Sequence, residues 1–123
     1  MRKLLMALLV TSSITNYAQE LPKNYNALIK EVEPQLINWR RHFHENPELS
    51  NREFNTGKYI ADFLKTLPGV EVRYPVAKTG VVAVLKGGKP GAVIALRADI
   101  DALPVFERNS LPFASKVTTE YNG

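Results

Sequence analysis

The sequence predicts an α/β fold in which two helices precede the strands of a mixed sheet covered by helices. Apolar residues recur at three- and four-residue steps over 25–43 and again over 54–67, as in amphipathic helices. From position 70 apolar and polar residues alternate, and two unbroken apolar runs follow at 81–85 and 92–96. Alternation and short apolar runs both indicate strands.

The first expected helix carries one apolar stripe. Pro34 interrupts this stripe, so either one kinked helix forms or a short helix restarts at Glu33-Pro34 with proline in its first turn. Asn46-Pro47 is expected to end the helix, because the residue before a proline disfavours helical geometry. The stripe consists of Tyr25, Leu28, Ile29, Val32, Leu36, Trp39 and Phe43.

The second expected helix begins at a capping box. Ser50 would be the N-cap, and Glu53 follows it three residues later. Pro68-Gly69 would end the helix, since neither residue continues one well. The apolar residues expected on its inward face are Phe54, Ile60, Ala61, Phe63, Leu64 and Leu67.

The expected strands follow in three segments. Residues 70–74 alternate as a half-buried strand does, and Thr79-Gly80 turns into the apolar run 81–85. The glycine-rich loop 87–91 separates that run from 92–96. Two apolar runs on either side of a short glycine loop predict a hairpin at the centre of the sheet, with both faces covered.

The composition excludes several classes of protein. The chain has 123 residues, 45% of them hydrophobic, and 16 Lys+Arg against 12 Asp+Glu. Such a chain is neither disordered throughout nor collagen-like. Because it contains no cysteine, disulfide-stapled folds and cysteine-based zinc or iron–sulfur sites are excluded. Its basic residues are interleaved with acidic ones, so no nucleic-acid partner is expected.

Residues 1–18 have the order of a secretory signal peptide. A basic head, Met1-Arg2-Lys3, precedes the apolar run 4–10, and the segment ends on the small residue Ala18. Cleavage before Gln19 would place the mature protein in the periplasm or outside the cell, without a stable membrane anchor. The run is shorter than the roughly 20 apolar residues that span a bilayer. The alternative is an apolar helix of the mature domain.

The charged residues that suggest chemistry follow the last apolar run. Arg97, Asp99 and Asp101 lie at its carboxyl end, where ligands bind in open α/β sheets. If the chain stays extended, Asp99 and Asp101 share a face, and such a pair can orient a metal-binding histidine or hold a cation. The alternative is structural: Arg97 and Asp99 form an ion pair, and Asp101 caps the next turn.

A second polar segment, 39–50, contains both histidines of the chain. His42 and His44 are two residues apart, so on a helix they point in different directions and cannot chelate one metal ion. Histidines near a helix end commonly cap the last carbonyls. A metal site is therefore not expected in this segment.

Together these segments resemble a known family. Residues 40–50, Glu53, the strand 79–83 and residues 95–104 are similar to the start of metal-dependent amidohydrolases of the aminoacylase/carboxypeptidase superfamily, above all the hippurate hydrolase and auxin-conjugate hydrolase branch. The resemblance covers about 29–123, against roughly the first quarter of a family member. It implies that the mature chain, from position 19 onward, is the incomplete start of a two-domain metallohydrolase.

The resemblance implies the hydrolysis of an amide bond in N-acyl amino acids or similar small conjugates. A water molecule bridging two divalent metal ions would attack, with a glutamate as general base. Carboxylate and imidazole ligands suit Zn, Mn, Co or Ni. A smaller domain later in the chain would form the lid and the interface of a homodimer.

The family pattern transfers to few residues of this chain. The superfamily strand ends in His-x-Asp, and here that position reads Arg97-Ala98-Asp99. Asp99 would therefore orient a metal ligand and Asp101 would support it, whereas Arg97 has no lone pair to offer a metal. The metal ligands themselves would come from a later Cys-Gly-His-Asp segment, so none is assigned within this chain. His44 and Glu48 would be structural and hold the first helix against the site strand.

Two other hypotheses remain open. One is a truncated secreted binding module without catalysis, and the other is a complete small enzyme that uses Asp99, Asp101 and His44. The residues that select the acyl group are not assigned. The isolated mature fragment is expected to be poorly stable, because the edges of its strands would be unpaired.

Overall fold

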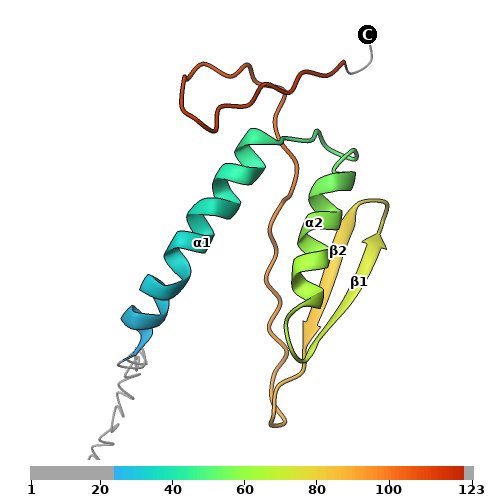
Figure 1. Cartoon of the computed structure of the whole chain (residues 1–123). Coiled ribbons are helices and arrows are strands. Elements are labelled where there is room, and N and C mark those ends of the chain that lie inside the picture. Colours follow the sequence, from blue (N-terminus) through green and yellow to red (C-terminus); the bar gives the residue numbers. More distant parts are fainter. Residues whose placement is uncertain (1–23, 121–123) are drawn as a thin grey trace, which may run out of the picture. The chain divides into compact units, whose positions relative to one another are not determined.

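The computed structural model describes residues 24–120, in which two helices precede a two-stranded sheet (Figure 1). This order confirms the predicted α/β class. The expected signal peptide, 1–18, lies outside the described residues. The elements are α1 (Tyr25–Glu45), α2 (Phe54–Lys65), β1 (Val70–Val76) and β2 (Gly80–Leu85).

Helix α1 continues through Pro34 as one helix. The restart at Pro34 is therefore wrong: a proline removes only one N–H donor, and the bonds on either side continue the helix. The predicted end before Asn46-Pro47 is confirmed, and the Asn46 side-chain amide donates to the carbonyl of His42.

The apolar stripe of α1 is largely exposed among the described residues. Trp39 and Phe43, near its carboxyl end, are the half-buried members. The ring of Trp39 meets that of Phe63 edge-on at 4.7 Å, and the ring of Phe43 meets that of Tyr59 at 5.6 Å. Aromatic pairs in this geometry attract beyond their shared buried area. The stripe thus contacts α2 through its last two turns.

Helix α2 packs on the hairpin through small residues. Ala61 is fully buried, and Thr56 and Gly57 are buried beside it. A Cβ atom on Gly57 would lie only 2.4 Å from the carbonyl oxygen of Thr79 and 2.9 Å from the ring of Tyr74. The helix approaches the hairpin too closely there for any side chain. The buried face is therefore narrower than the sequence predicted, and three residues expected inside are partly exposed: Phe54, Phe63 and Leu67.

The hairpin is formed by β1 and β2, which pair antiparallel. Val70 lies opposite Leu85 and Arg73 opposite Val82, with an irregularity between Arg73 and Val76. Residues along β1 alternate between half-buried and exposed, as predicted. Ala77 and Lys78 take positive φ angles of 46° and 89° in the turn between the strands.

The predicted pairing of 81–85 with 92–96 is wrong. The hydrogen-bonded neighbour of β2 is β1, and residues 86–101 run without regular secondary structure. Val93 and Leu96 are each 96% exposed, and most of β2 is exposed as well. An unbroken apolar run is typical of a strand covered on both faces, but it does not say which strand lies beside it. In residues 24–120 neither helix is long and apolar enough to cross a membrane.

Candidate functional site

Asp99 and Asp101, the predicted site residues, are exposed in the segment that precedes Ala102. Oδ1 of Asp99 accepts a hydrogen bond of 2.7 Å from the Arg97 guanidinium, as the structural alternative predicted. The side chain of Asp101 makes no hydrogen bond or ion pair with residues 24–120, so it does not cap the next turn there. The structure therefore does not bring the two carboxylates onto one partner.

The donors in the described residues do not fit a metal centre. Across 24–120 no three histidine or carboxylate side chains are close enough together to hold an ion. The ring of His42 stacks on that of Tyr59 at 4.3 Å, and Nε2 of His44 lies 2.6 Å from Oε2 of Glu107. Both histidines are thus occupied by partners within the chain.

Glu48 caps the amino-terminal end of α2. Its Oε2 accepts a hydrogen bond of 2.7 Å from the Thr56 N–H, and its Oε1 accepts from the backbone and side-chain amides of Asn55 at 3.2 and 2.8 Å. Partial burial alone would raise the pKa of Glu48, but these N–H donors hold that pKa below its ordinary value. A carboxylate is also favoured here by the helix dipole.

The backbone of Glu48 holds the segment that carries the predicted site residues. Its carbonyl accepts a hydrogen bond of 2.8 Å from the Ala102 N–H, and Leu49 forms a parallel bridge with Ala102. Glu48 therefore joins α2 to the residue that directly follows Asp101. The structural role predicted for Glu48 is right in kind, but the helix that its side chain holds is α2 and not α1.

The expected capping box at Ser50 is absent from the described structure. Asn51 takes a positive φ of 62° in a turn closed from Arg52 to Leu49, and α2 begins at Phe54 with no side-chain cap from Glu53. Glu48 occupies the helix end, which leaves Glu53 for other donors. Capping from outside the local four-residue window is not visible in the capping-box pattern.

Glu53 is instead a buried link between the start of α2 and the hairpin turn. It is 5% exposed, and its Oε2 accepts a hydrogen bond of 2.7 Å from the hydroxyl of Thr79, which is also buried. Its Oε1 accepts from the Asn51 N–H. Burial opposes the charged form, but these hydrogen bonds and nearby Lys78 hold the pKa of Glu53 below its ordinary value.

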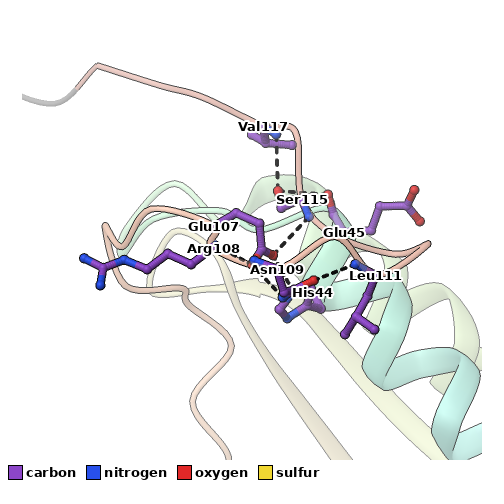
Figure 2. Close-up of polar contacts among 8 residues, drawn as sticks. All are labelled: His44, Glu45, Glu107, Arg108, Asn109, Leu111, Ser115 and Val117. Atoms are coloured by element: carbon purple, nitrogen blue, oxygen red, sulfur yellow. Dashed lines mark hydrogen bonds and ion pairs between the residues drawn. The ribbon is translucent and has the colours of Figure 1, made fainter.

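Glu107 is a second carboxylate hub, which the sequence analysis did not single out. Figure 2 shows its side chain facing His44, Asn109 and Ser115. Oε1 accepts from the N–H groups of Arg108 and Asn109 at 2.9 and 3.2 Å, and from the Asn109 side-chain amide at 2.6 Å. Oε2 accepts from the Ser115 N–H at 3.2 Å and contacts His44.

No local pattern could have identified Glu107. His44 lies 63 positions away from it and Ser115 lies eight positions away. The Asn109 N–H and His44 lower the pKa of Glu107. Because an ionised carboxylate only accepts hydrogen bonds, Nε2 of His44 carries the proton in this contact. Asn109, two positions after Glu107, is a residue type that favours turns. It does not indicate that Glu107 contacts His44.

Glu48 and Glu107 both line an open groove of about 520 Å³. Its lining comes from three segments of the chain, 47–49, 102–107 and 115–119. The groove begins at the residue after Asp101. It is therefore the concave surface nearest in sequence to the predicted site residues, and concave surfaces are where small ligands bind.

Comparison with known proteins identifies the class of protein that shares this sequence. No protein-family model matches the chain. Over 90 residues it is 50% identical to the thermostable carboxypeptidase 2 of Saccharolobus solfataricus. Over 88 residues it is 50% identical to the N-acetyl-L-cysteine deacetylase of Bacillus subtilis, and over 89 residues it is 46% identical to an N-acyl-L-amino acid amidohydrolase of Geobacillus stearothermophilus. Each match covers 72% of this chain and 21–24% of the relative.

Solved structures agree with these relatives. The Bacillus subtilis YXEP protein, described as a dinuclear metal binding peptidase from the M20 family, matches with a TM-score of 0.65 and 52% identity. The match covers 72% of this chain and 25% of the YXEP chain. An aminohydrolase from methicillin-resistant Staphylococcus aureus matches with a TM-score of 0.71 and 42% identity, over 78% of this chain and 25% of that one.

These relatives are hydrolases of amide and peptide bonds, as the resemblance implied. At about half identity the matched part of this chain is homologous to them and shares their local fold. The chain spans about a quarter of the length of the relatives that it matches.

Proposed function

We propose that the protein hydrolyses the amide bond of N-acyl amino acids or similar small conjugates, with this chain as the amino-terminal part of its catalytic domain. The observation that carries the proposal is the 46–50% identity to an N-acyl-L-amino acid amidohydrolase and an N-acetyl-L-cysteine deacetylase over 72% of the chain. The hippurate and auxin-conjugate branch of the resemblance is our proposal for its place among these enzymes.

Two further observations favour a role within a longer protein. The relatives are about four times as long as the stretch that matches them. In addition, Val93, Ile94 and Leu96 are almost fully exposed, although an unbroken apolar run is costly to leave in water. We propose that strands from the remainder of the protein cover this run.

The metal chemistry is assigned to that remainder. The donors of residues 24–120 do not fit a metal centre. The description of a solved relative as a dinuclear metal binding peptidase supports a pair of divalent ions in the whole protein, of which Zn, Mn, Co and Ni are the candidates. A Cys-Gly-His-Asp segment would supply ligands.

Within this chain, Asp99 is proposed to orient a metal ligand and Asp101 to support it. Both carboxylates are exposed, and the Glu48 carbonyl fixes the backbone directly after Asp101. Asp99 would exchange the guanidinium of Arg97, its present partner, for an incoming histidine. We also propose that a signal peptide is cleaved after Ala18 and that the protein is periplasmic or secreted. A lid domain would form the interface of a homodimer.

The experiment begins with the reading frame past the codon for Gly123. The proposal expects it to continue for roughly two to three hundred codons, as a two-domain enzyme needs, with a Cys-Gly-His-Asp segment near its start. The whole protein, loaded with Zn or Mn, should then release free amino acid from N-acetyl amino acids, and a chelator should abolish this activity.

Three outcomes would contradict the proposal. A stop codon after Gly123 in the intact gene, or a whole protein that turns over no acyl amino acid with any of the four metals, would favour the secreted binding module. Metal-dependent turnover by the 123-residue chain alone would favour the small enzyme that uses Asp99, Asp101 and His44.

A further inference from the structure

We propose that Glu107 is a positioning residue of the candidate site: it holds the 115–119 wall of the groove in the place where an acylated substrate binds. This inference rests on the proposed function. It concerns a residue that neither the motifs nor the relatives' descriptions single out.

The geometry ties two distant points of the chain to one side chain. Five donors converge on the Glu107 carboxylate, three of them within the next two residues. The other two are the Ser115 N–H, eight residues later, and His44 in the last turn of α1. The carboxylate therefore closes the loop 107–115 and fixes it to the helix end.

Ser115 passes this restraint to the groove wall. Its hydroxyl donates to the carbonyl of Glu45 at 3.2 Å and accepts from the Val117 N–H at 3.2 Å (Figure 2). Ser115 and Val117 line the same groove as Ala102 to Glu107. The position of the 115–119 segment thus depends on contacts that begin at Glu107, whereas Asp99 bonds Arg97 instead.

The variants separate the restraint from the loss of a charge. Glu107→Gln keeps the shape of the side chain but replaces one acceptor oxygen with an amide donor. The contacts of Oε1, with Arg108 and Asn109, and those of Oε2, with Ser115 and His44, therefore cannot both survive. Glu45→Gln is the matched control, because its side chain points away from the hub in Figure 2 while its carbonyl remains. His44→Gln retains a donor near the position of Nε2, and His44→Ala removes it.

The first measurement is limited proteolysis of the whole protein. Arg108 lies within the clamped loop, and trypsin cleaves after arginine only where the backbone can open. The cleavage rate after Arg108 should rise by about tenfold in Glu107→Gln and His44→Ala and stay near that of wild type in Glu45→Gln and His44→Gln. An unchanged rate in Glu107→Gln would overturn the clamp.

The second measurement is steady-state kinetics with N-acetyl amino acids. A displaced groove wall weakens substrate binding, but it does not change the contact that Asp99 makes with Arg97. KM should therefore rise about tenfold in Glu107→Gln and His44→Ala, with kcat within about twofold of wild type, and His44→Gln should restore KM. If Glu107→Gln is cleaved faster but has the same kcat and KM as Glu45→Gln, Glu107 holds the loop without affecting the substrate. This result would overturn the positioning role.

Failure of the proposed function is distinguishable from failure of this inference. If the wild-type protein hydrolyses no acyl amino acid, the proposed function fails first and the positioning role falls with it, whatever the cleavage rate. If the wild type is active and Glu107→Gln matches it in both measurements, only the present inference is wrong.

Discussion

The segments 48–85 and 86–106 differ in how far their polar groups are hydrogen-bonded and their apolar side chains are buried. In the first, buried Glu53 and Thr79 bond each other, Ala61 is fully buried and Glu48 caps α2. In the second, apolar side chains as large as those of Val93 and Leu96 face solvent. The first segment is stabilised by contacts among its own residues, and the second contains the pattern of a strand without a strand paired to it.

This difference shows what an apolar pattern specifies. It records the environment that a segment requires, and that environment can come from residues far away in the chain. Polar contacts can bridge the same distances, as Glu48 does to Ala102. Substitutions on the two sides of this divide therefore test whether the run 92–96 is covered in the whole protein.

The largest expected effect is that of Ile94→Lys in the whole protein. If strands cover the run, a buried lysine there has no partner, and the free energy of unfolding should fall by about 4 kcal/mol. Urea titration measures this loss. Ile94→Val is the control, at about 1 kcal/mol. A loss below about 0.5 kcal/mol for Ile94→Lys would mean that the segment faces solvent in the whole protein as well.

Gly57→Ala, in segment 48–85, should lower the free energy of unfolding by about 3 kcal/mol, because the new Cβ overlaps the backbone of the hairpin turn. Its nearest atom, the carbonyl oxygen of Thr79, lies at 2.4 Å and cannot rotate away. Gly88→Ala is the control, since nothing lies within 4 Å of its Cβ position. An increase in stability, as helix propensity alone would give, would contradict the close approach of α2 to the hairpin.

The local elements could be predicted because their causes are local. The end of α1 before Asn46-Pro47, the alternation along β1 and the turn before Gly80 each depend on a few adjacent residues. The capping box could not be judged in this way, because Glu48 competes for the same helix end from outside the motif. The partner of the run 92–96 could not be predicted for the same kind of reason.

The sequence indicated where in the chain to look for the candidate site. Asp99 and Asp101 were located by their place after an apolar run, and the family resemblance was confirmed at the level of hydrolase relatives. Their catalytic roles remain a prediction. Glu107 was not predicted, because its partner His44 lies 63 positions away and no sequence pattern links the two residues.

A smaller effect is expected at the buried link. Thr79→Val removes the donor to Glu53 and leaves a buried carboxylate short of one hydrogen bond, which should cost about 2 kcal/mol. The pKa of Glu53 should rise in this variant, because burial then opposes its charge with less compensation. Thr79→Ser keeps the hydroxyl and should lose less. A loss in Thr79→Val no larger than that in Thr79→Ser, measured by urea titration, would contradict a stabilising role of this hydrogen bond.

The smallest expected effect is that of Glu48→Gln, which should cost about 1 kcal/mol at neutral pH through the weaker helix cap. Because the pKa of Glu48 is lowered by folding, its contribution is complete above its ordinary pKa of 4.5 and is lost as the pH falls through the lower folded-state value. The gap between wild type and Glu48→Gln should therefore close in acid. Glu31→Gln, an exposed control on α1, should change stability by less than about 0.5 kcal/mol. A gap that persisted well below pH 4.5 would show that Glu48 acts through its shape and not through its charge.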